Sequence, residues 1–209
     1  MCRFKSGIIL KNKVEIAPGE NDSHSDLLES LGIEDNYINA SKMFVRAELV
    51  PEDDEWWLDP EEYPEKWKFV VDQDIVPDWF DKGEYEKIFR EGVCKWWKTH
   101  VLVDEKIDEL NSGYYRLKRC EVKRICNDVK VLLDSSQVGK MYDSSQVGEM
   151  YGSSQVGKMY DSSQVGKMYD SSQVGEMYGS STARDFKNYP NIKIIVPETG
   201  KFEMVVFKK

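Results

Sequence analysis

The sequence predicts an α+β N-terminal domain followed by a narrow β-solenoid of nine-residue repeats and a C-terminal β-hairpin cap. Residues 134–178 are five tandem copies of one unit, Asp/Gly-Ser-Ser-Gln-Val-Gly-Lys/Glu-Met-Tyr. All six tryptophans lie between residues 56 and 97, so the side chains that dominate core burial precede the repeats. After the repeats, residues 192–196 and 202–207 flank Pro-Glu-Thr-Gly, which is typical of a β-hairpin.

The first elements of the N-terminal domain follow from local turn and cap signals. Residues 7–16 place apolar side chains on both sides of a turn at Asn12, which is typical of a hairpin. Ser23, with Asp26 three residues later, resembles a capping box that starts a helix, and Gly32 is a typical C-terminal stop. We therefore expect a hairpin and then a short helix.

The rest of this domain shows two strand patterns and one long helix pattern. Residues 43–50 alternate as a strand does, and residues 67–71 are typical of the next strand. Residues 83–101 predict the longest helix, because apolar side chains recur there every three or four positions. Short strands are expected over residues 100–133, leading into the repeats.

A short fixed period predicts a solenoid, whose end copies must differ from the others in order to cap exposed strand edges. Residues 125–133 align as a degenerate leading copy, with Val129 in the Val position and Leu132 in the Met position. Residues 179–187 align as a degenerate closing copy. The predicted domains are a globular α+β domain over residues 1–124, the solenoid over 125–187 and the capping hairpin over 188–209.

Within each copy we expect Val, Met and the second Ser to point inward, while the Gly and the opening Asp/Gly mark two turns. Gln, Lys/Glu and Tyr then face outward, and in a parallel stack each lies above its counterpart about 4.8 Å away. These rows are the candidate binding residues: Tyr142, Tyr151, Tyr160, Tyr169 and Tyr178, with Gln146, Gln155 and Gln164. Such a row could stack against sugars or bases, or could simply cover the rod.

The copies do not diverge between odd and even positions, which favours one coil for every nine residues. Each Lys of the Lys/Glu position is followed three residues later by Asp, whereas each Glu is followed by Gly. This pattern predicts a local Lys–Asp pair. The alternative is the whole duplication of two DNA repeat variants. The Gly-Gly-x-Gly-x-Asp signature of calcium-binding nonapeptides is absent, which argues against a calcium roll.

Bulk composition limits the classes of partner and compartment. The 209 residues carry a formal net charge of −9, which argues against nonspecific nucleic-acid binding by the whole chain. No apolar run reaches the roughly 18 residues of a membrane span. The N-terminus lacks the apolar core of a signal peptide.

The four cysteines are Cys2, Cys94, Cys120 and Cys126, and they form no C-x-x-C or zinc pattern. We therefore expect reduced thiols and a cytoplasmic location, in a bacterial or phage-infected cell.

Three segments carry candidate chemistry. Asp72, Asp74 and Asp78 share one loop and could bind a divalent metal or act in acid/base catalysis, although turn and helix-cap roles are the alternative. His24 could be a general base or part of a plain capping segment. Basic residues between 116 and 124 could contact phosphate or form a solvated strand face: Arg116, Lys118, Arg119, Lys123 and Arg124.

Two motifs resemble a family of bacterial and phage proteins. Asp72–Phe80 reads Asp-Gln-Asp-Ile-Val-Pro-Asp-Trp-Phe, with Ser-His-Ser-Asp-Leu-Leu upstream at Ser23–Leu28, and the repeats read Ser-Ser-Gln-Val-Gly-x-Met-Tyr. The resemblance implies a phage or prophage accessory origin and a β-solenoid tail. It implies no activity and no catalytic residues.

The sequence favours a non-enzymatic binding or assembly protein that presents a repeat rod, with the phage resemblance suggesting a modulator of a host protein. No catalytic constellation, cofactor site or small-molecule substrate site is identified, and a protein partner or self-association is expected. One alternative is a metal-dependent enzyme that uses the Asp72/Asp74/Asp78 loop. The other is a structural protein that self-assembles through the rod.

Overall fold

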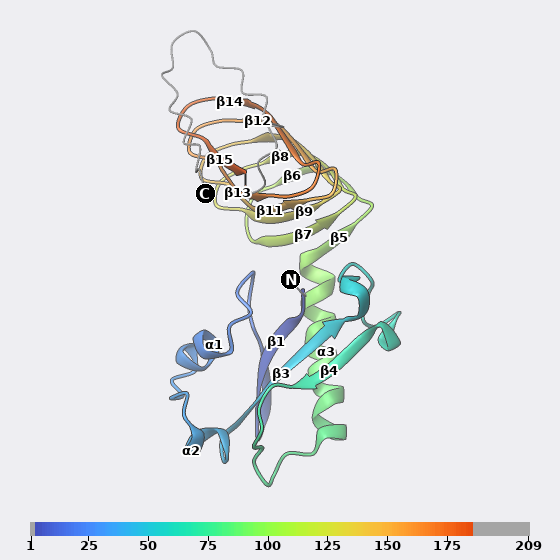
Figure 1. The fold of residues 1–209 in the computed structure, drawn as a ribbon, viewed down its shortest axis with the longest axis vertical. Helices are drawn as coiled ribbons and strands as arrows, with labels where there is room; N and C mark the ends of the chain where they lie inside the picture. The colour runs from blue at the N-terminus through green and yellow to red at the C-terminus, as the bar shows by residue number, and fades with distance from the viewer. Residues whose placement is uncertain (1–2, 186–209) are drawn as a thin grey trace. The chain divides into compact units, whose positions relative to one another are not determined.

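The computed structural model describes residues 3–185, and its contacts divide the chain into two compact units after His100 (Figure 1). The expected α+β region is followed by a β-solenoid, as the sequence predicts. The solenoid begins at Val101, so residues 101–124, which the sequence assigned to the globular domain, belong to it. The expected C-terminal hairpin, over residues 192–196 and 202–207, lies outside the described residues.

The first unit contains a four-stranded antiparallel sheet in the order β2-β1-β3-β4. Its strands are β1 (Lys5–Leu10), β2 (Lys13–Ile16), β3 (Phe44–Pro51) and β4 (Trp67–Val71). The predicted hairpin and both predicted strands are therefore confirmed. The helices are α1 (His24–Ser30), α2 (Tyr37–Ala40) and α3 (Lys82–His100), with 3₁₀ turns η1 (Glu52–Asp54) and η2 (Pro64–Lys66).

Helices cover both faces of this sheet. Because side chains alternate along β1, Ile8 faces one side and packs in a cluster with Leu28 and Phe44, while Gly7 faces α3. A Cβ added to Gly7 would lie 2.8 Å from a ring carbon of Phe89, and one added to Gly92 would lie 2.8 Å from Ile16. These two glycines let α3 approach the sheet closely.

The second unit winds through eleven described strands that alternate between two parallel sheets. One sheet has the order β14-β12-β10-β8-β6 and the other β15-β13-β11-β9-β7-β5. The strands are β5 (Val101–Val103), β6 (Lys106–Leu110), β7 (Tyr114–Lys118), β8 (Glu121–Ile125), β9 (Lys130–Asp134), β10 (Gln137–Met141), β11 (Gln146–Tyr151), β12 (Gln155–Met159), β13 (Gln164–Met168), β14 (Gln173–Met177) and β15 (Thr182–Asp185). Each coil therefore contains one strand from each sheet.

The expectation of nine residues per coil is wrong, because two nonapeptides make one coil. Gln137 stacks on Gln155, and Gln146 stacks on Gln164, eighteen residues apart in each case. The reason is chain length: a five-residue strand spans about 17 Å. The other four residues of a nine-residue repeat reach at most about 14 Å. That is too short to make two turns and return along the length of the strand. Coils before the repeats are shorter, since Val101 pairs with Arg116, fifteen residues later.

The inward positions are the second Ser, Val and Met, as expected. Ser154, Val156 and Met159 are at most 1% exposed, and their counterparts along the rod are also buried. The leading copy is out of the predicted register, because Val131 and Leu133, not Val129 and Leu132, stack under Val147 and Met150. Val129 is buried nonetheless, beneath the Ser position: its carbonyl accepts the Gln146 N–H. In the closing copy Ala183 stacks on Val165, as its alignment predicts.

The two repeat positions expected at turns have different roles. The opening Asp/Gly position does turn the chain, with φ of 57° at Asp143 and 61° at Gly152. The Gly of each Gln-Val-Gly lies within a strand instead. A Cβ on Gly157 would lie 2.6 Å from the backbone oxygen of Gly139 in the adjacent coil. This glycine is required by the close approach of coils, not by a turn.

Two other expectations concern membranes and thiols. None of the described helices combines the length and the apolar composition needed to cross a bilayer. Cys94, Cys120 and Cys126 are free thiols, and burial raises the pKa of all three. Cys2 lies outside the described residues.

Candidate functional site

The outward tyrosines form two rows and not the single row expected from a nine-residue coil. Tyr142, Tyr160 and Tyr178 follow strands of one sheet, and their rings stack in sequence at 5.0 Å between centroids with 7° between planes. Tyr151 and Tyr169 stack at 4.7 Å and 11° at the other turn of the coil. The tyrosines of both rows are half-buried. Each of the two turns of the coil therefore exposes part of a stack of parallel phenol rings.

The outward glutamines likewise form two rows because alternate copies occupy opposite sheets. Gln146 lies above Gln164 on one sheet, and Gln155 lies between Gln137 and Gln173 on the other. Gln146 is half-buried and the other four are exposed. The prediction that these glutamines face outward is therefore correct, whereas their binding role stays a prediction.

Charged side chains in the Lys/Glu position pair between coils, not with the nearby Asp. Lys158 lies 2.6 Å from Glu176, and Lys167 lies 3.2 Å from Glu149. The Lys158 ammonium and the Tyr178 hydroxyl, which donates at 2.5 Å, lower the pKa of the Glu176 carboxyl. The carboxylates of Asp143, Asp161 and Asp170 each accept a backbone N–H of the preceding coil, as Asp161 does from Asp143 at 3.3 Å. Their role is to hold neighbouring turns together.

Lys140 is the exception in this pattern, because Arg124 and Lys158 flank it in the same row. Replacing it with glutamate gives a row of alternating charge, so Lys140→Glu is expected to stabilise the solenoid by about 0.2–1 kcal/mol. Glu176→Lys is expected to destabilise it by a similar amount. Urea denaturation followed by far-UV circular dichroism measures both. The opposite order would support the local Lys–Asp pairing, since a glutamate at position 140 would then repel Asp143.

The basic cluster before the repeats is paired with acidic side chains of the neighbouring coils. Its ion pairs are Lys118–Asp134 at 2.8 Å, Arg119–Asp104 at 2.6 Å, Lys123–Asp108 at 2.5 Å and Arg124–Glu109 at 2.6 Å. Arg116 is buried and donates to the Tyr114 hydroxyl. This neutralisation within the rod agrees with the interpretation of the cluster as a strand face rather than a phosphate site.

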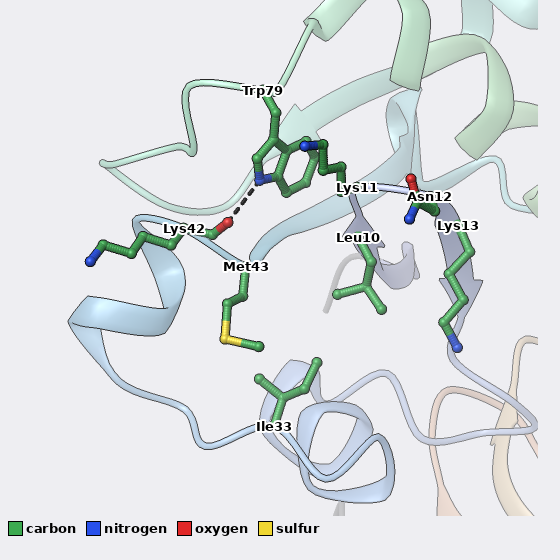
Figure 2. A pocket seen from close by; sticks show the side chains of 8 residues that line it. All are labelled: Leu10, Lys11, Asn12, Lys13, Ile33, Lys42, Met43 and Trp79. Atoms are coloured by element: carbon green, nitrogen blue, oxygen red, sulfur yellow. Dashed lines mark hydrogen bonds between the residues drawn. The ribbon is translucent and has the colours of Figure 1, made fainter.

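In the first unit, a shallow open groove of about 500 Å³ lies beside the hairpin turn (Figure 2). Its apolar lining comes from Leu10, Ile33, Met43 and Trp79. The indole of Trp79 is fixed because its Nε1–H donates to the Lys42 carbonyl at 2.7 Å. Three lysines also line the groove: Lys11, Lys13 and Lys42.

The three loop carboxylates predicted as a metal site do not gather. Within residues 3–185, the only group of three potential ligands within 4.8 Å of one another joins Asp72 to His24 and Glu48. Asp74 and Asp78 are not part of it. The neighbouring Gln73 holds the loop to the sheet, because its amide oxygen accepts the Arg46 N–H at 2.8 Å. Sequence reasoning missed Glu48, because a single acidic residue on an alternating strand carries no local signal of a site.

Three elements position this group. Ser23 caps α1, and its side chain accepts the Asp26 N–H, which fixes the first helical residue, His24. Glu48 lies on β3, and Asp72 follows β4, where its backbone N–H donates to the Arg46 carbonyl at 2.9 Å. Burial, and then the nearby carboxylates Asp72 and Asp22, raise the pKa of Glu48. Negative charge is therefore concentrated beside a histidine.

Comparison with protein-family models, with curated proteins and with solved structures found no match.

Proposed function

We propose that this chain is a non-enzymatic assembly protein whose solenoid associates with a second copy along the edge formed by Tyr142, Tyr160 and Tyr178. The observation that carries the proposal is the stacking of these three half-buried rings at the coil spacing. Aromatic side chains supply large contact areas at low conformational-entropy cost, and they are enriched at the centres of protein interfaces.

The spacing of the row favours a second copy as the partner. A two-fold interface brings the same patch of both subunits together. In an antiparallel pair, Tyr160 faces its own counterpart, and Tyr142 faces Tyr178. A matching repeat of rings is certain to be present on another copy of this chain.

The charges beside the row fit the same arrangement. Reversing one copy brings Lys140, which lies between two cations, next to Glu176 of the other copy. Most other charges in the repeat rows are already neutralised within one chain by the Lys158–Glu176 and Lys167–Glu149 pairs. Two such edges can therefore approach with little electrostatic repulsion.

Sedimentation equilibrium over a concentration series tests the proposal. The protein is expected to dimerise, and Tyr160→Ala is expected to weaken the dimer at least about tenfold, as removal of a central aromatic does. Tyr169→Ala, in the other row, is the matched control and should leave the dissociation constant unchanged. Lys140→Glu should weaken association while stabilising the fold. A protein that stays monomeric, or a Tyr160→Ala variant that dimerises normally, would overturn the proposal.

A further inference from the structure

The first unit contains a group of mixed nitrogen and oxygen donors that the assembly function does not use. His24, Glu48 and Asp72 each offer one ligand atom, and these atoms lie within 4.8 Å of one another. They come from α1, β3 and the loop after β4, so the fold, not sequence proximity, brings them together. The His24 side chain is only 10% exposed, whereas that of Asp72 is 58% exposed.

The hydrogen bonding of His24 determines which ring nitrogen faces the carboxylates. Its Nε2 lies 3.1 Å from the Ala47 carbonyl oxygen, and a carbonyl can only accept, so Nε2 carries the proton. In the neutral ring, Nδ1 then presents a lone pair. An oxygen of the Asp72 carboxylate, which is an acceptor as well, lies 3.4 Å from Nδ1.

Two acceptors this close repel each other unless a cation, a proton or a water molecule bridges them. Glu48 adds a second carboxylate, with an oxygen within 4.8 Å of the other two ligand atoms. A divalent ion would satisfy all three groups at once. The Nε2–H bond to a backbone carbonyl is also the contact that commonly orients a metal-bound histidine.

We propose that His24 Nδ1, Glu48 and Asp72 bind one divalent transition-metal ion, with Zn²⁺ as the representative. Imidazole nitrogen favours zinc and its neighbours over Mg²⁺ and Ca²⁺, which prefer sites made of oxygen alone. The exposure of Asp72 leaves one side of the site open to solvent, so water completes the coordination sphere.

Isothermal titration of the metal-free full chain with Zn²⁺ tests this site, and tryptophan fluorescence during heating is the second readout. All six tryptophans lie in the first unit, so their transition reports the unit that holds the site. Wild type is expected to bind one ion at this site and to unfold at a higher temperature with Zn²⁺. Each of His24→Ala, Glu48→Gln and Asp72→Asn should weaken binding by at least the roughly 10–100-fold seen when supporting contacts of a metal site are lost.

Asp74→Asn is the matched control, because it removes a carboxylate from the same loop but not from the group. It should bind Zn²⁺ as wild type does. Asp72→Asn separates loss of zinc binding from misfolding. The Asp72 side chain is exposed, so this variant should unfold at the same temperature as metal-free wild type. Zinc binding that survives in both His24→Ala and Asp72→Asn would overturn the proposal. So would Mg²⁺ binding as tight as Zn²⁺ binding, which would indicate carboxylates alone.

Discussion

Asp22→Ala is expected to lower the free energy of unfolding of the first unit by about 3–5 kcal/mol, the usual cost of removing one member of a buried ion pair. The Lys5 side chain is 1% exposed, and its ammonium lies 2.8 Å from the Asp22 carboxylate. It also donates to the Gly19 carbonyl at 3.2 Å and lies 4.2 Å from the centre of the Trp96 ring. The variant removes the ion pair while the ammonium stays buried, and neither the carbonyl nor the ring face supplies the negative charge that is lost.

Tryptophan fluorescence during urea denaturation measures this effect in the first unit alone, because the solenoid contains no tryptophan. The double variant Lys5→Met/Asp22→Asn is the control. It removes both charges, while the new asparagine side chain keeps an oxygen that can accept the Ser6 N–H, which now donates to Asp22 at 3.2 Å. It should recover most of the lost stability, since apolar replacement of a whole buried pair is often neutral. A double variant no more stable than Asp22→Ala would contradict the charge argument.

Gly157→Ala is expected to destabilise the solenoid by about 1–3 kcal/mol, the usual cost of overpacking. The new Cβ would lie 2.6 Å from the Gly139 backbone oxygen, and a backbone atom held in a parallel ladder has little room to move. Reduced freedom of the unfolded chain would favour alanine by about 0.4–1 kcal/mol. The steric cost exceeds that gain, so the net effect is a loss.

Far-UV circular dichroism during thermal unfolding follows this change, and the tryptophan transition should remain at the wild-type temperature. Ser162→Ala is the control within the same unit, because Ser162 is an exposed turn residue. Gly83→Ala is the control for the substitution itself: its Cβ would meet only Asp81 at an ordinary 3.5 Å, so a small gain is expected. A Gly157→Ala variant as stable as wild type would contradict the packing of the coils described above.

Much of the first unit was predictable because its signals are local. The Asn12 turn, the Ser23 cap and the alternation of residues 43–50 each depend on neighbours a few positions apart, and each is confirmed. The His24, Glu48 and Asp72 group was not predictable. Its members lie 24 residues apart in sequence, and only the antiparallel pairing of β3 and β4, with α1 packed nearby, brings them together.

The register of the solenoid also depends on contacts between residues that are distant in sequence, and it too could not be predicted. Identical copies cannot reveal whether one or two of them close a coil, so the lack of divergence between odd and even copies was misleading. At nine-residue spacing Lys140, Glu149 and Lys158 alternate, whereas at eighteen Lys140 stacks on a like charge. The predicted register of the leading copy was wrong for a related reason. The coils before the repeats are shorter, so Val131, not Val129, takes the Val position.

The sequence by itself determined that this chain contains an α+β domain and a repeat solenoid, and which side chains of each repeat point inward. Those properties follow from alternation and turn chemistry, which act within a few residues. Only the tertiary structure decided that two repeats close each coil, that the tyrosines divide into two rows, and that Lys158 pairs with Glu176. These features depend on how many residues the chain needs to run along a strand, turn twice and return, which is a property of the whole coil and not of one repeat.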